Sequence, residues 1–99
     1  MNEEINSSGW TFFTNHGHVL IFISQNCSAT LREVAEHVGI TERATHMIVS
    51  DLEQAGFLSK RRQGRRNYYD INADMPLRHP LEAHCSIKQI IDTIVESNN

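Results

Sequence analysis

The sequence predicts a mainly α-helical domain that carries a small β-hairpin and ends in a further helix. Three observations support this fold class. Two segments with apolar residues at helical spacing are separated by a glycine, Gly39. Two short runs with strand character, 57–61 and 67–71, flank a turn at Gln63 and Gly64. Isoleucines at helical spacing then occupy the C-terminal part of the chain.

The composition is that of a single globular domain. The chain has 99 residues, of which 39% are hydrophobic and 21% charged, and its formal net charge is −3. Its longest apolar run, 19–23, is too short to cross a bilayer, and no basic stretch followed by an apolar one indicates a secretory signal. Cys27 and Cys85 are too few and too isolated for a disulfide framework. We therefore expect a cytoplasmic protein.

The N-terminal third begins with a polar segment, 1–9, which we expect to be a flexible N-terminus. The aromatic segment that follows, 10–13, is expected to be a short strand or the lead-in to a helix. Residues 15 to about 25 are expected to form a buried helix, although the apolar run inside them would also suit a strand.

The next helix has clear signals at both ends. Thr30 and Glu33 fit a capping box, in which each side chain accepts a hydrogen bond from the other residue's backbone N–H. Gly39 is expected to end this helix in a left-handed conformation. Its apolar face is predicted to consist of Leu31, Val34, Ala35 and Val38.

A following helix is predicted over residues 41–56, capped by Thr41 and ended by Gly56. We expect Thr45 to lie at the border of the core. The inner face is predicted to consist of Ala44, Ile48, Leu52 and Ala55. In the hairpin that follows, Leu58 and Tyr69 are expected to face inward and the arginines outward.

The last helix is predicted over 78–96, with Pro80 in its first turn and residues 72–77 as a linker before it. Its apolar stripe is expected to run from Leu81 and Ala83 along the isoleucines that follow. These elements divide the chain into a flexible N-terminus (1–9), a main domain (10–77) and a C-terminal helix (78–96).

Positive charge is concentrated in residues 60–67. This segment holds five of the nine Lys and Arg residues, so the rest of the chain carries four basic residues against twelve acidic ones. A mildly acidic protein with one strongly basic segment is expected to bind a polyanion through that segment. A solvated charged segment without a ligand remains the alternative.

The order of two helices, a tight glycine turn and a basic hairpin is that of a winged helix-turn-helix. The motif residues are Leu31-Arg32-Glu33-Val34-Ala35-Glu36-His37-Val38-Gly39-Ile40-Thr41, then Leu52-Glu53-Gln54-Ala55-Gly56-Phe57-Leu58. Over roughly residues 14–72 the chain resembles MarR- and ArsR-type transcriptional regulators of bacteria and archaea. The resemblance implies a sequence-specific regulator that binds double-stranded DNA, with a recognition helix at 41–56 in the major groove and a basic wing at about 58–71 on the flanking groove or backbone.

The candidate DNA-binding residues lie on the outer side of the helix 41–56, in the wing and on the preceding helix. Arg43 is the strongest candidate for a base-edge or phosphate contact, and Glu42 would accept from cytosine or orient Arg43. In the wing we favour Arg62, Arg65 and Arg66, with Lys60 or Arg61 on the DNA backbone. The full predicted set is Arg32, Thr41, Glu42, Arg43, His46, Met47, Ser50, Lys60, Arg62, Arg65 and Arg66.

The C-terminal isoleucine stripe is wider than a small domain needs for its own core, so a homodimer is expected. The predicted dimer interface consists of Trp10, Phe13, Ile87, Ile90, Ile91 and Ile94. Alternatively, the stripe folds back onto its own domain, and the same residues can serve both purposes.

Three other functions compete with DNA binding. A metal-responsive regulator would use the six histidines and two cysteines, but His84 and Cys85 are adjacent on a helix and point about 100° apart, so no metal site is expected. An enzyme or a bound cofactor is not expected, because no glycine-rich phosphate loop or catalytic motif is present. A winged helix that binds protein or RNA remains the main alternative, and a small-molecule effector, if any, would bind at the dimer interface or beside it.

Overall fold

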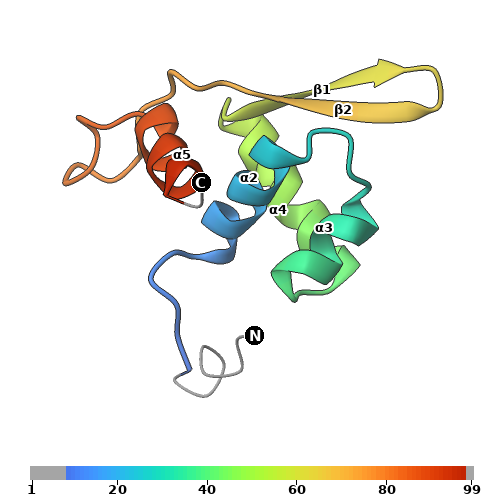
Figure 1. Cartoon of the computed structure of the whole chain (residues 1–99), viewed down its shortest axis with the longest axis horizontal. Coiled ribbons are helices and arrows are strands. Elements are labelled where there is room, and N and C mark those ends of the chain that lie inside the picture. Colours follow the sequence, from blue (N-terminus) through green and yellow to red (C-terminus); the bar gives the residue numbers. More distant parts are fainter. Residues whose placement is uncertain (1–8, 98–99) are drawn as a thin grey trace.

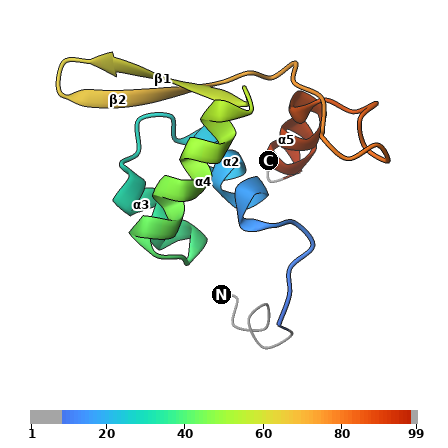
Figure 2. The same cartoon turned by 180° about the vertical axis from the view of Figure 1, so that it is seen from behind.

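The computed structural model describes residues 9–97 and confirms the expected fold class: helices with one antiparallel hairpin. The elements are α2 (Asn15–Gln25), α3 (Leu31–Val38), α4 (Glu42–Gln54), β1 (Leu58–Gln63), β2 (Arg66–Ile71) and α5 (Ile87–Glu96). Helices α2, α3 and α4 form a bundle, and the hairpin extends from the bundle toward the side on which α3 lies (Figure 1). Helix α5 lies on the opposite side (Figure 2). The expected flexible N-terminus falls almost entirely on residues 1–8, outside the described residues.

Residues 15–25 form one continuous helix, α2, so the apolar run 19–23 is helical and is not a strand. Val19, Leu20 and Ile23 are its buried residues, and their spacing places them on one helical face. The aromatic segment before α2 is irregular, so it is a lead-in rather than a strand.

The glycine turn between α3 and α4 has the expected caps. Thr30 Oγ1 accepts from the Glu33 N–H at 3.1 Å, and Glu33 Oε1 accepts from the Thr30 N–H at 2.8 Å. Gly39 ends α3 with φ of 89°, and nothing lies within 4 Å of where a Cβ would stand, so backbone conformation rather than space requires glycine there. Thr41 caps α4 by accepting from the Ala44 N–H at 3.0 Å.

One face of α4 lies at the centre of the core. Ile48, Val49 and Leu52 are buried there. Thr45 differs from the expectation of a border position: it is fully buried, and its hydroxyl donates to the Thr41 carbonyl at 3.0 Å, which satisfies its polar atom. The other core residues are Val19, Leu20, Ile23, Val34, Phe57, Leu58, Tyr69 and Ile87.

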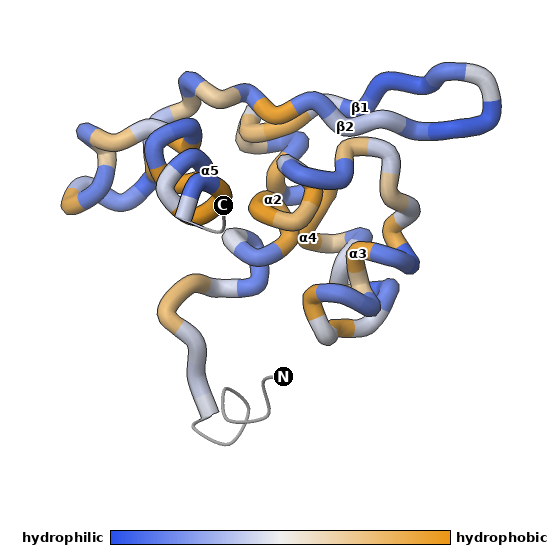
Figure 3. Tube along the Cα trace, in the orientation of Figure 1, coloured by the Kyte–Doolittle hydropathy of each residue, from blue (hydrophilic) through white to orange (hydrophobic). Residues whose placement is uncertain are grey.

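The hairpin pairs Leu58 with Ile71 at its base and Gln63 with Arg66 at its tip. The turn therefore consists of Gly64 and Arg65, one residue later than expected. Gly64 has φ of 65° and Arg65 does not have positive φ, so glycine must occupy the first turn position, as in a type II′ turn. Leu58 and Tyr69 are buried as predicted. The outer half of the hairpin is strongly hydrophilic (Figure 3).

Strand β2 is also held from the side by the loop between α2 and α3. The Tyr69 N–H donates to the Cys27 carbonyl at 2.9 Å. Together with the burial of the Tyr69 ring, this bond fixes the base of the hairpin to the helical bundle.

The predicted start of the last helix is wrong. Residues 78–86 form turns, and α5 begins only at Ile87, because Ser86 and Gln89 form a capping box. A bridge between Pro76 and Ser86 closes the preceding segment into a loop, in which the Leu77 N–H donates to the Cys85 carbonyl at 2.9 Å. Leu81 therefore lies on an exposed loop and Pro80 in a turn. Across residues 9–97, no helix has the length and apolarity to span a bilayer.

Ser86→Ala tests this helix start. Because Ser86 caps α5, its loss should lower the free energy of unfolding by about 0.5–2 kcal/mol, measured by urea denaturation followed by circular dichroism. Thr93→Ala, at an exposed site inside α5, is the control and should be neutral or slightly stabilising. A helix that started at Pro80 would contain Ser86 in its interior, where alanine is favoured, so a stabilising Ser86→Ala would contradict the structure.

Candidate nucleic-acid interface

The side of α4 that faces away from the core carries the predicted reading residues. Glu42, Arg43, His46 and Met47 are exposed, and Met47 is exposed to 63% although it is a large apolar residue. Ser50 is half-buried and its hydroxyl accepts from Gln54 Nε2 at 3.4 Å, so it lies at the edge of this surface. The structure therefore leaves most of the predicted helix face open to solvent.

The N-terminal end of α4 offers backbone donors. Thr41 uses its hydroxyl oxygen to cap Ala44, so the N–H groups of Glu42 and Arg43 are left free within the first turn. Such donors, at the positive end of the helix dipole, are suited to hold a phosphate. No hydrogen bond or ion pair joins Glu42 to Arg43, and Arg43 has no such partner among residues 9–97.

We define the wing as β1, β2 and the turn between them. The strand register places its basic residues on two opposite faces of the hairpin. Arg62 opposes Asn67, and Lys60 opposes Tyr69, so both share the face that is buried at the base of the wing. Arg66 projects from the other face, and Arg65 lies in the turn. Arg62, Arg65 and Arg66, which were favoured together, thus occupy two faces and the tip rather than one surface.

These basic residues also differ in whether they have partners. Lys60, Arg65 and Arg66 form no side-chain hydrogen bond or ion pair within the part of the chain that the structure describes. Arg62 Nε donates to the Gly64 carbonyl at 3.1 Å, within its own turn. Arg61, which was considered for a backbone contact, is bound to Asp70 at 3.1 Å instead. Sequence reasoning missed this pair, because it depends on the register.

The remaining predicted contact, Arg32, lies on the exposed side of α3. Its Nε is 3.8 Å from Glu36 Oε2, one helical turn later, and both side chains are largely exposed. An exposed pair of this length restrains the arginine little, so Arg32 can still turn toward a phosphate.

The predicted dimer residues fall into three groups. Trp10 is 70% exposed and Phe13 41% exposed, ahead of α2. Ile90, Ile91 and Ile94 are half-buried along α5. Ile87 is 6% exposed and belongs to the protomer's own core, so its assignment to an interface is not supported by its position. The isoleucine stripe therefore serves its own domain at its first residue and leaves its later residues partly open.

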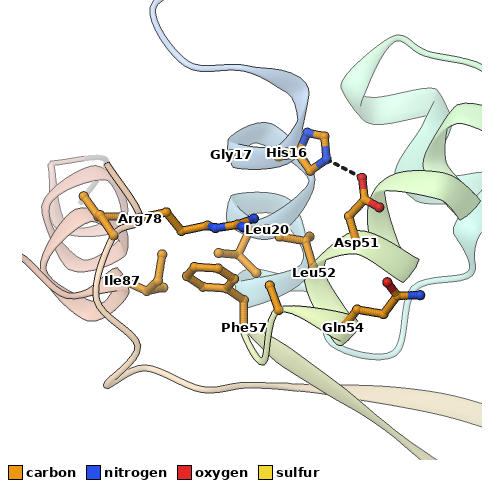
Figure 4. Close-up of a pocket in the computed structure, with 11 residues that line it drawn as sticks. His16, Gly17, Leu20, Asp51, Leu52, Gln54, Phe57, Arg78 and Ile87 are labelled. Atoms are coloured by element: carbon orange, nitrogen blue, oxygen red, sulfur yellow. Dashed lines mark hydrogen bonds and ion pairs between the residues drawn. The ribbon is translucent and has the colours of Figure 1, made fainter. Parts of the chain in front are cut away.

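A cavity of about 600 Å³ lies between α2, the C-terminal half of α4 and the segment that leads into α5 (Figure 4). Its polar rim includes a pair between His16 Nε2 and Asp51 Oδ2 at 2.9 Å, which joins α2 to α4. The Arg78 side chain reaches across the cavity toward α2 (Figure 4). The apolar lining consists of Leu20, Leu52, Ala55, Phe57, Leu77 and Ile87.

Candidate metal ligands do not converge. Within residues 9–97, no group of three or more His, Cys, Asp or Glu side chains is placed to hold a metal ion. His16 pairs with Asp51, and a ring nitrogen of His18 is 3.1 Å from Asn15 Oδ1.

Comparison with known proteins points to the same fold, although the family model covers α2 to α4 and only the first two residues of the wing. Residues 14–59 match the family model of winged helix-turn-helix DNA-binding domains. A search of curated proteins found no match.

Several solved structures share the fold. A predicted DNA-binding transcriptional regulator from E. coli superposes with a TM-score of 0.61 at 15% identity, over 96% of this chain and 85% of that one. Streptococcus pneumoniae FabT, solved in complex with DNA, has a TM-score of 0.58 at 22% identity, over 96% and 67%. The PcaV transcriptional regulator from Streptomyces coelicolor, solved with its natural ligand, has a TM-score of 0.56 at 23% identity, over 86% and 62%.

At these identities the likeness to solved structures establishes the fold. The expected fold is thereby confirmed: residues 14–59 match the winged helix-turn-helix DNA-binding model, and the chain shares its fold with solved transcriptional regulators.

Proposed function

We propose that this protein binds specific double-stranded DNA sequences as a small dimeric transcriptional regulator. The N-terminal half of α4 enters the major groove, which is wide enough to admit one helix, and the wing contacts the flanking groove or backbone. The observation that supports this most directly is the outer face of α4, whose exposed Arg43, His46 and Met47 have no role in the fold.

Each side chain on this face has a chemistry that suits DNA. Arg43 can donate to a guanine edge or to a phosphate, and His46 can contact either. Met47 offers an apolar surface of the kind that contacts a thymine methyl group. Thr41 and the free N–H groups of the first turn can hold a phosphate, which would fix the register of the helix on the duplex.

The placement of arginines on both faces of the wing suits insertion into a narrow groove of DNA. Arg62 and Arg66 project from opposite faces, so each can approach one of the two phosphate strands that border a groove. Arg65 at the turn would lie deepest, and Lys60 would contact the backbone near the base. Arg32 on α3 would add a phosphate contact on the other side of α4.

A dimer would place two such surfaces on one duplex. Ile90, Ile91 and Ile94 of α5, together with Trp10 and Phe13, form the proposed interface. Two recognition helices about 34–36 Å apart would read half-sites one helical turn apart, related by the protein's two-fold axis.

Selection of preferred duplexes from a random pool by the purified full chain tests the function. We expect an inverted repeat, because a symmetric dimer reads the same half-site twice. A single, unrepeated half-site would contradict the dimer while preserving DNA recognition. A pool that stays random would contradict sequence-specific binding and favour the protein- or RNA-binding alternative.

The double variant Arg65→Ala/Arg66→Ala tests the wing. If both arginines bind phosphates, the slope of log K against log salt concentration should become shallower by about 0.9 for each phosphate that is no longer bound, and affinity should fall on all sequences. The slope is measured by fluorescence anisotropy with a labelled duplex. Arg78→Ala/Lys88→Ala removes the same charge on the α5 side and should leave the slope unchanged. An unchanged slope in the wing variant would refute the assignment.

The cavity supports a second proposal, that a small molecule regulates DNA binding. Its volume lies within the usual range for ligand sites of about 300–1,000 Å³, its floor is apolar, and its rim offers few polar groups. Leu52 and Asp51 of α4 line it, so an occupant would touch the same helix whose other end is proposed to read DNA. Arg78, which has no ion-pair partner among the described residues, favours a ligand with a carboxylate.

Thermal melting with benzoate and with uncharged benzamide tests the cavity. Benzoate should raise the melting temperature in proportion to the logarithm of its concentration once it exceeds the dissociation constant, whereas benzamide should raise it less. Arg78→Gln should abolish the difference between the two compounds, because it removes the charge that distinguishes them. Equal shifts for the two compounds in the unmodified protein would contradict recognition of a carboxylate.

A further inference from the structure

We propose that Arg61 is a positioning residue of the wing and does not contact DNA. The side chain of Asp70, on β2, binds the guanidinium group of Arg61, on β1. This cross-strand contact stiffens the wing and leaves Arg61 unable to bind a DNA phosphate. This inference deepens the DNA-binding function proposed above and rests on it for its effect on affinity, although the pairing within the wing can be measured without DNA.

The contacts of Arg61 engage most of its guanidinium group. Nε donates to Asp70 Oδ2 at 3.1 Å and Nη2 donates to Asp70 Oδ1 at 3.3 Å, so the two groups meet fork to fork. Nη1 donates to Gln63 Oε1 at 3.1 Å. The guanidinium carbon lies 5.2 Å from the centre of the Tyr68 ring, within the range of a cation–π contact.

The register explains why these groups meet. Arg61 pairs with Tyr68 and Ser59 pairs with Asp70, so all four side chains project from the same face of the hairpin, and Asp70 is the diagonal neighbour of Arg61. The opposite face carries Leu58 and Tyr69, which the helices bury. The Arg61 contacts therefore join β1 to β2 on the face that has no core packing.

Such a connection matters because a two-stranded hairpin has little stability of its own. The base of this wing is fixed by Leu58, by Tyr69 and by the bond from Tyr69 to Cys27. The tip carries Arg65 and Arg66, which have no partners among residues 9–97. Arg61 lies between the two, so it is placed to restrict the directions in which the tip can point.

Electrostatics keep the pair together. The hydrogen bonds from Arg61 hold the pKa of Asp70 below its ordinary value, so this carboxylate is ionised at neutral pH. A phosphate that recruited Arg61 would have to displace Asp70 and would then face that carboxylate unpaired. Lys60, Arg65 and Arg66 carry no such cost, because no acidic side chain is bound to them in the described structure.

The experiment compares salt slopes of DNA binding for single variants of the full chain, on the duplex selected from the random pool. Arg61→Ala should weaken binding by the same factor at every salt concentration and leave the slope unchanged. Asp70→Asn should make the slope steeper by about 0.9 per protomer, because it frees Arg61 to bind a phosphate.

Two controls match these changes in charge. Arg66→Ala removes an arginine from the same face of the hairpin, but one without a partner, so its slope should become shallower by about 0.9 per protomer. Asp74→Asn removes a carboxylate outside the wing and should leave the slope unchanged. The exchanged pair Arg61→Asp/Asp70→Arg should restore both the affinity and the slope toward those of the unmodified protein.

The outcomes separate the two proposals. If Arg61→Ala makes the slope as shallow as Arg66→Ala does, or if Asp70→Asn does not change it, Arg61 contacts phosphate and the inference is overturned while DNA binding stands. If the unmodified protein shows no salt-dependent duplex binding, the proposed function fails. In that case faster amide hydrogen exchange in β1 and β2 of Arg61→Ala, relative to Arg66→Ala, would still support the positioning role, and equal exchange would refute it.

Discussion

The burial of one side of α4 is the constraint on which the rest of the molecule depends. Ile48, Val49 and Leu52 leave water by packing within the core that α4 shares with α2, α3 and β1. Thr45 can be buried beside them because its hydroxyl bonds to the Thr41 carbonyl. Because a helix is rigid, packing the buried side of α4 into the core also sets the direction in which its opposite side faces. The exposed face of α4 is therefore a consequence of the core, and its side chains are held in solvent by a rigid helix rather than by contacts of their own.

The same core also positions the wing. Phe57 and Leu58 follow α4 directly and are buried, so β1 must leave the bundle at the C-terminal end of α4. Tyr69 brings β2 back to the same core, and its bond to the Cys27 carbonyl ties the wing to the loop between α2 and α3. Only the base of the hairpin is stabilised by these contacts. Beyond it, order depends on cross-strand side chains, which is where Arg61 lies.

Local sequence signals, such as helix caps and apolar periodicity, predicted most of the helices. Contacts between segments that are distant in the sequence could not be predicted from such signals. The capping box at Thr30 and the glycine at Gly39 located α3 closely, and helical periodicity predicted the exposed face of α4. Pro80 suggested a helix, but a bridge between the segments around it closes a loop there. The partners within the wing required the register, because a two-residue turn that lies one residue later shifts every cross-strand pair by two residues while leaving each side chain on the same face. In the expected register Arg61 would lie opposite Arg66 and two residues farther from Asp70, so their partnership could not be inferred from the sequence.

Charge distribution connects these structural facts to selectivity. Outside residues 60–67 the chain carries four basic residues against twelve acidic ones, so most of its surface repels a polyanion. Attraction is concentrated in the wing, because the other four cations are spread over α3, α4, the segment before α5 and α5 itself. If Arg61 were also unpaired, the face of the hairpin that lacks core packing would carry a free cation behind the tip, and charge alone would favour the approach of DNA to that face. Its pairing with Asp70 instead leaves the unpaired arginines at the tip, where the geometry of a groove, and not charge alone, decides whether they can bind.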